Sequence, residues 1–174
     1  MAKRTCMEAA LSKLNYRMRS KAELKKALAD LDYDTEEIAE TIEELESFGY
    51  VDDRRFSEEF IRSSARKNWS SSRIIRALRE KGISKDMAEE ALEDHLNGEE
   101  SGIDSGSFDR ERAFSTGSKM ADEQLIKGKK IDDKFLSKVG RRLMSLGYGS
   151  GVCYYVIGRL RDEKKSTDQV EEDL

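Results

Sequence analysis

Apolar residues recur at helical spacing along most of the chain. From residue 24 to residue 31, and again from 38 to 45, they stand three and four positions apart, which is the pattern of one buried helix face. A capping box pairs an N-terminal Ser, Thr or Asp with a Glu three residues later, and it marks the start of a helix. Two such pairs precede these patterns: Ser20 with Glu23, and Asp34 with Glu37. The pattern predicts an all-α fold.

The predicted helix ends share a second pattern. A leucine is followed four residues later by a turn residue and then by a hydrophobic one, as in Leu28-Asp32-Tyr33, Leu45-Gly49-Tyr50, Leu78-Gly82-Ile83 and Leu143-Gly147-Tyr148. A Schellman cap has this arrangement, in which the turn residue adopts the left-handed conformation and the next side chain folds back onto the helix. Asp32 is the exception among the four, since only glycine adopts that conformation without strain.

These features repeat along the sequence. A shift of fifty residues places the apolar positions of the first part on those of the second, and a further shift of sixty-five places the second on the third. A period near fifty is typical of stacked helical repeats. The sequence therefore predicts three tandem three-helix repeats, at residues 1–50, 51–97 and 108–162. It also predicts a flexible Gly/Ser-rich linker at residues 98–107 and a frayed polar tail at residues 163–174.

Composition supports this interpretation and limits the functional classes. The chain of 174 residues has no proline, 39% charged residues and only 37% hydrophobic residues, which favours an elongated molecule with several small cores. A net charge of −4 argues against attachment to nucleic acid by overall charge. No stretch approaches the roughly eighteen apolar residues of a membrane span, and the N-terminus does not resemble a signal peptide. We expect a cytoplasmic monomer with two incidental thiols, Cys6 and Cys153.

Charge is segregated into blocks. Residues 1–26, 54–81 and 127–142 are basic, with net charges of +6, +6 and +5, whereas residues 32–48 and 85–111 each carry −8. These charges can simply form surface ion pairs of little net value between neighbouring helices. Alternatively, the basic helices form a stripe that meets an acidic protein groove or a phosphate backbone. The candidate partner-binding residues of this stripe are Arg17, Arg19, Arg62, Arg66, Lys67, Arg73, Arg76 and Arg79.

No motif indicates catalysis, a metal or a cofactor. His95 is the only histidine, and its alignment with leucines of the other repeats favours a packing or cap role. The acidic pairs 52–53 and 132–133 precede helical patterns, where aspartate caps free backbone N–H groups. The glycine-rich segment 147–151 lacks the Lys-Ser/Thr ending and the preceding strand of a phosphate loop. For Trp69, a core or cap role is favoured over an exposed anchor. We expect a protein that is not an enzyme.

Three motifs, in this order, indicate a family. They are Arg17-Met18-Arg19-Ser20, then Gly49-Tyr50-Val51-Asp52-Asp53-Arg54-Arg55-Phe56, then Leu78-Arg79-Glu80-Lys81-Gly82-Ile83-Ser84. Their order and spacing over residues 14–93 resemble the RecX family, whereas residues 108–162 resemble its third repeat only broadly. The segment before Trp69 departs from the family pattern, which tends to have glycine and basic residues there, and the linker is unusually long and acidic.

The resemblance implies a curved, modular protein that lies in the groove of a RecA filament on single-stranded DNA. It further implies restraint of ATP hydrolysis and strand exchange in DNA repair and the SOS response. The alternative is a helical module that binds single- or double-stranded DNA directly through its basic middle repeat. The steepness of the salt dependence of binding separates the two, because each neutralised phosphate adds to the slope.

Overall fold

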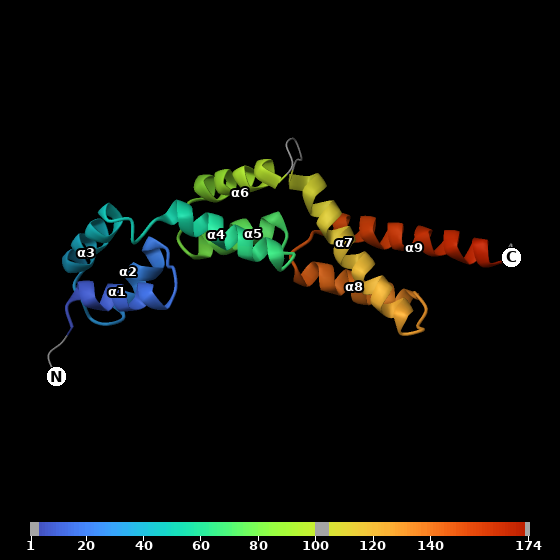
Figure 1. The fold of residues 1–174 in the computed structure, drawn as a ribbon, viewed down its shortest axis with the longest axis horizontal. Coiled ribbons are helices and arrows are strands. Elements are labelled where there is room, and N and C mark those ends of the chain that lie inside the picture. Colours follow the sequence, from blue (N-terminus) through green and yellow to red (C-terminus); the bar gives the residue numbers. More distant parts are fainter. Residues whose placement is uncertain (1–3, 100–104, 173–174) are drawn as a thin grey trace. The chain divides into compact units, whose positions relative to one another are not determined.

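The computed structural model describes residues 4–99 and 105–172, and in that part of the chain every regular element is an α-helix (Figure 1). The all-α prediction is therefore confirmed. The helices follow one another as α1 (Cys6–Tyr16), α2 (Lys21–Ala29), α3 (Thr35–Ser47), α4 (Asp53–Arg66), α5 (Ser71–Glu80), α6 (Lys85–Glu99), α7 (Ser105–Ile126), α8 (Asp133–Ser145) and α9 (Ser150–Glu172).

The chain divides into two compact units rather than one unit for each predicted repeat. Unit 1 comprises Met1–Arg62 and Ile75–His95, and unit 2 comprises Ser63–Ile74 and Leu96–Leu174. The middle three helices, α4 to α6, therefore contribute to both units. Unit 1 contains most of α4 and the later part of α5, whereas unit 2 contains the last turn of α4 and the start of α5.

In unit 1, helices α1, α2 and α3 pack against one another as a three-helix bundle (Figure 1). Leu24 and Leu28 of α2 are completely buried, and α3 contributes Ile42 and Leu45 to the same core. In the middle helices Leu78 and Leu92 are also buried, at the positions fifty residues after Leu28 and Ile42. Burial thus follows the predicted repeat. Removal of these apolar side chains from water is the main stabilising contribution.

In unit 2, helices α7, α8 and α9 pack around a second core. Leu143 is fully buried and Tyr148 is 4% exposed, as their alignment with Leu78 and Ile83 predicts. Gly117 of α7 allows close packing, because a Cβ atom there would lie 2.7 Å from the Val156 side chain. The chain's only tryptophan, Trp69, packs against this core, which confirms the role expected for it.

All four predicted left-handed turn residues have a positive φ: 59° at Asp32, 71° at Gly49, 84° at Gly82 and 96° at Gly147. Two further residues with a positive φ, Asn68 and Gly128, were not predicted. The cap after α3 shows both Schellman hydrogen bonds, from Gly49 N to Glu46 O and from Tyr50 N to Leu45 O, each 2.9 Å. The same two bonds are present in the caps after α5 and α8. The predicted backbone geometry of these three caps is therefore confirmed, whereas the Tyr50 side chain is 61% exposed and does not fold back onto its helix.

The two predicted capping boxes are only half formed. Ser20 and Asp34 each accept a hydrogen bond from the N–H group three residues later, but the complete reciprocal box is at Thr5 and Glu8. The prediction for Ser20 was wrong about Glu23, because the Glu23 carboxylate instead binds two cationic side chains.

The predicted linker and tail differ from the structure. Helix α6 extends to Glu99 and α7 begins at Ser105, so the two ends of the predicted linker 98–107 are helical. Residues 100–104 lie outside the described part of the chain. The predicted tail from residue 163 continues α9 as far as Glu172, because this segment contains neither glycine nor proline to end a helix.

Candidate partner-binding surface

In unit 1, the N-terminus of α2 packs against the turn that follows α5. Ser20 is completely buried, and its hydroxyl donates to the Lys81 carbonyl at 2.6 Å while it accepts from the Glu23 N–H. The Lys21 N–H donates to Asp53 Oδ1 at 2.9 Å. Glycine is required at residue 82, because a Cβ atom there would lie 2.2 Å from Cβ of Ala22. We call this contact the first junction.

Unit 2 contains a matching contact between the start of α5 and the turn after α8. Ser70 is buried, and its N–H donates to the Leu146 carbonyl at 3.0 Å. The Ser71 N–H donates to Asp109 Oδ1 at 3.0 Å, and a Cβ atom at Gly147 would lie 2.6 Å from Cβ of Arg73. We call this contact the second junction.

The two junctions are built alike. In each, a buried serine that begins one helix lies on the glycine turn of a later helix, and an aspartate from another helix accepts a hydrogen bond from the next N–H. Burial raises the pKa of Asp109, and its hydrogen bonds from Ser71 oppose that rise. The sequence predicted that Gly82 and Gly147 end helices, but not that the start of another helix packs on each of them. The repeat of serine at residues 20 and 70, fifty apart, could have indicated these contacts.

Two predicted partner-binding residues, Arg17 and Arg19, have contacts at the first junction or near it. Arg17 pairs with Glu23 at 2.9 Å, and Glu23 also binds Lys81 Nζ at 2.8 Å. The half-buried Arg19 has its Nε atom 3.5 Å from the Lys13 carbonyl. Burial raises the pKa of Glu23, but the hydrogen bonds and positive charges of Arg17 and Lys81 lower it, to about 2. Arg17 therefore has a structural role in the junction.

We expect Glu23→Gln to remove a pH-dependent contribution to stability. The folded pKa of about 2 lies below the ordinary value of 4.5, so the ionised Glu23 stabilises the fold above pH 4.5 and loses this effect as the pH falls toward 2. Because Arg17 is partly exposed, we expect a loss of only about 1 kcal/mol at pH 7. Urea unfolding at pH 7 and pH 3 measures it. The exposed Glu44→Gln is the control, and an equal loss at both pH values would contradict the assignment.

Arg73, another predicted partner-binding residue, contacts other residues of unit 2. Its guanidinium Cζ lies 3.9 Å from the centre of the Trp69 ring, and its Nη1 donates to the Ser145 carbonyl. Both partners lie with Arg73 in unit 2. An arginine that stacks on an aromatic ring and also binds a helix-end carbonyl stabilises the fold. These contacts give Arg73 a structural role within unit 2, and its part in partner binding stays a prediction.

We expect Arg73→Ala to destabilise unit 2 by about 1–3 kcal/mol, through loss of the ring contact and of the hydrogen bond to Ser145. Trp69 reports this unit directly, because it is the chain's only tryptophan. Its fluorescence during urea unfolding provides the measurement. Arg76→Ala, three residues further along α5, should change stability by less than about 0.5 kcal/mol. Equal effects of the two substitutions would contradict the structural role of Arg73.

The remaining predicted cations are exposed. Arg62 pairs with Glu59 on its own helix at 2.8 Å, and Lys67 Nζ lies 5.9 Å from the Trp69 ring. Within the described residues, the other three make no ion pair and lie exposed on the surface: Arg66 in unit 2, and Arg76 and Arg79 in unit 1. Among the eight predicted residues, these three are exposed and have no ion pair, side-chain hydrogen bond or ring contact with a described residue.

Pairing between basic and acidic helices does occur, but through other residues. Arg54 binds Glu58 on its own helix and both Glu90 and Asp94 on α6. Lys21 binds Glu46 on α3 at 2.5 Å. Ion pairing within the fold therefore accounts for part of the charge segregation. It does not account for Arg66, Arg76 and Arg79, which have no acidic partner among the described residues.

The paired aspartates act as helix caps. Asp52 accepts from the N–H groups of Arg54 and Arg55, and Asp132 accepts from that of Phe135. No cluster of His, Cys, Asp or Glu suited to a metal ion is found among residues 4–99 and 105–172. In the same residues no helix is long and apolar enough to cross a membrane. His95 is half-buried in α6.

Comparisons with known proteins point to one family. Models of the first and second three-helix domains of RecX match residues 6–45 and 52–92. A regulatory protein RecX from Mycolicibacterium vanbaalenii is 32% identical, over 83% of this chain and 76% of the relative. Another, from Clostridium botulinum, is 26% identical over 87% of this chain, which thus spans 66% of that relative's length.

Solved structures agree with the fold. The crystal structure of RecX from Lactobacillus salivarius superposes with a TM-score of 0.65 at 22% sequence identity. The match covers 90% of this chain and 94% of that one. At this level of identity the likeness supports the fold, an all-α array of three-helix repeats, rather than any particular binding residue.

Proposed function

This chain belongs to the RecX family of regulatory proteins, and from that premise we propose that it binds the RecA filament on single-stranded DNA. In this proposal it inhibits ATP hydrolysis and strand exchange by the filament, in DNA repair and the SOS response. It acts by binding and not by catalysis. The basis is the family membership together with the exposed cations of the middle helices.

The observation that carries the binding proposal is a pair of predicted arginines on α5 that the fold leaves exposed and without an ion pair. Arg76 and Arg79 are three residues apart on α5, where they share one face, and Leu78 of the same helix is completely buried. Both arginines are exposed and make no ion pair with a described residue. Arginine is enriched at protein interfaces, where its rigid fork binds carboxylates in pairs. An acidic face of the filament is the partner that such side chains suit.

The repeat architecture supports the same proposal. A filament offers equivalent sites at regular intervals, and a chain of repeats can engage more than one of them. Once one repeat is bound, the next binds at a high effective concentration, so that contacts that are weak singly add up to firm attachment. Arg66 in unit 2 would supply one such contact, separate from that of Arg76 and Arg79 in unit 1.

Direct binding to DNA is the second candidate, because exposed arginines also bind phosphates. The two candidates differ in the salt dependence of binding. Phosphate contacts should weaken binding with a slope near −0.9 per neutralised phosphate on duplex DNA and about −0.7 on single strands. Binding to a protein face has a shallower dependence.

Fluorescence anisotropy of dye-labelled protein, titrated with RecA filaments and with naked single-stranded DNA at several salt concentrations, tests the proposal. We expect tight binding to the filament and at least about ten-fold weaker binding to the same DNA without RecA. Equal affinity for naked DNA, with a steep salt slope, would favour the DNA-binding alternative. No binding to the filament would reject the proposed function.

A further inference from the structure

Two large aromatic side chains are exposed at the end of α3. Phe48 is 65% exposed and Tyr50 is 61% exposed, on either side of Gly49. Large aromatic side chains stabilise a folded protein when they are buried, so Phe48 and Tyr50 contribute little to the stability of the monomer. Tyrosine and other aromatics are, however, enriched at the energetic centres of protein interfaces.

A comparison of the helix caps shows that the Tyr50 side chain does not take the buried position of its cap. In the caps after α5 and α8, the residue that follows the glycine packs back onto the helix, with Ile83 3% and Tyr148 4% exposed. After α3 the buried position belongs instead to the next residue, Val51, which is 2% exposed. Tyr50 is displaced into solvent, and Phe48 faces solvent in the turn before it.

The helix that leads to this aromatic pair carries unneutralised negative charge. Glu40, Glu43 and Glu44 are exposed on α3 and make no ion pair with any residue in the described part of the chain. Glu40 and Glu44 are four apart, where like charges repel. The last turn of α3 contains no basic residue to offset the negative end of the helix. This arrangement disfavours the isolated helix and would be relieved by a positively charged partner.

We propose that Phe48, Tyr50, Glu40, Glu43 and Glu44 form a docking surface for a lysine- or arginine-rich segment of a partner protein. We call it the aromatic–acidic surface. Cationic side chains can stack on the exposed rings and pair with the carboxylates, and the aliphatic stems of those side chains cover the rings. The proposal is independent of the role of Arg76 and Arg79, which are cations on another helix and suit a partner of opposite charge.

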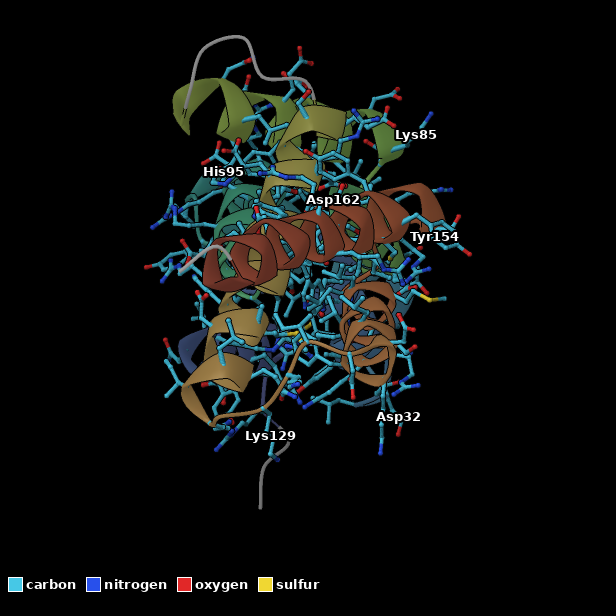
Figure 2. All side chains as sticks on the ribbon, turned by 90° about the vertical axis from the view of Figure 1, so that its right-hand side faces the viewer. Asp32, Lys85, His95, Lys129, Tyr154 and Asp162 are labelled. Atoms are coloured by element: carbon cyan, nitrogen blue, oxygen red, sulfur yellow. The ribbon has the colours of Figure 1, made fainter. Side chains whose placement is uncertain are left out.

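Titration with a dye-labelled synthetic peptide of lysine and leucine tests this surface, and the same peptide with glutamate in place of lysine is the negative control. Phe48→Ala combined with Tyr50→Ala should weaken binding of the lysine peptide about ten-fold. Met144→Ala combined with Tyr154→Ala is the matched control, since these side chains are 64% and 74% exposed in unit 2 (Figure 2 shows Tyr154 on α9). The control should bind like the wild type.

Charge reversal tests whether peptide binding depends on the aromatic–acidic surface or only on the overall negative charge of the protein. Glu40→Lys combined with Glu44→Lys should weaken peptide binding about ten-fold, because like charges then face each other. Asp86→Lys combined with Glu93→Lys on α6 changes the net charge equally and should bind nearly normally. Circular dichroism confirms that each variant is folded. Equal losses in both charge variants, unchanged binding in the aromatic variant, or no binding by the wild type would overturn the proposal. So would self-association of the wild type that the aromatic substitutions abolish.

Discussion

Replacing both Arg76 and Arg79 with glutamate is expected to weaken inhibition of RecA-driven ATP hydrolysis at least about ten-fold. The two side chains are exposed on α5 and make no ion pair with a described residue, so the fold gives them no structural partner to lose. Like charges brought together across an interface cost several kcal/mol, which corresponds to more than a ten-fold loss of binding. The concentration of the variant that halves the ATPase rate measures the effect.

Stability should change little in this variant. Arg79 lies in the last turn of α5, where a positive charge is favourable, so its reversal should cost about 0.5–1 kcal/mol. Lys25→Glu combined with Lys26→Glu, exposed on α2, is the control for net charge. It should inhibit like the wild type. Normal inhibition by the arginine variant would remove Arg76 and Arg79 from the binding surface, and equal loss in the lysine variant would indicate an effect of net charge.

Replacing Gly82 with alanine is expected to cause the largest loss of stability among the turn glycines of unit 1. A residue with a side chain is strained at φ 84°, by about 1–2 kcal/mol. In addition the new Cβ atom would lie 2.2 Å from Ala22 Cβ, and relieving such overpacking costs about 1–3 kcal/mol. We therefore expect a total loss of about 2–5 kcal/mol in the free energy of unfolding.

Gly49→Ala is the matched control, because its φ is 71° and, apart from the two adjacent residues, no atom lies within 4 Å of the added Cβ position. It should lose only the backbone strain. Urea unfolding followed by circular dichroism compares the two variants. A larger loss for Gly82→Ala supports close packing at the first junction, and equal losses would mean that Gly82 is needed only for its backbone conformation.

Features determined by neighbouring residues were predictable from the sequence. The positive φ at Gly49, Gly82 and Gly147 follows from the local Schellman pattern, and the buried positions follow from the spacing of leucines along each helix. The sequence repeat also predicted which positions of one part of the chain are buried from the buried positions of another. Leu28 and Leu78, fifty residues apart, are both completely buried.

Features that depend on segments distant in sequence were not predictable. The sequence identified Arg73 as a candidate partner-binding residue, but it could not show that Trp69 and the Ser145 carbonyl lie within reach of its side chain. The same holds for Glu23, whose spacing from Ser20 indicated a capping box, whereas Lys81 lies fifty-eight residues away in sequence. For the candidate site, composition identified the basic helices, and only the structure separated the arginines used by the fold from Arg66, Arg76 and Arg79.

The most direct test of the central claim is the rate of ATP hydrolysis by RecA filaments on single-stranded DNA, measured as the wild-type protein is added. If the chain regulates the filament by binding it, the rate should fall with increasing protein and reach a plateau, at protein concentrations below that of RecA. Controls without DNA should show no effect on the low basal rate. A rate that stays unchanged at protein concentrations well above that of RecA would contradict the account.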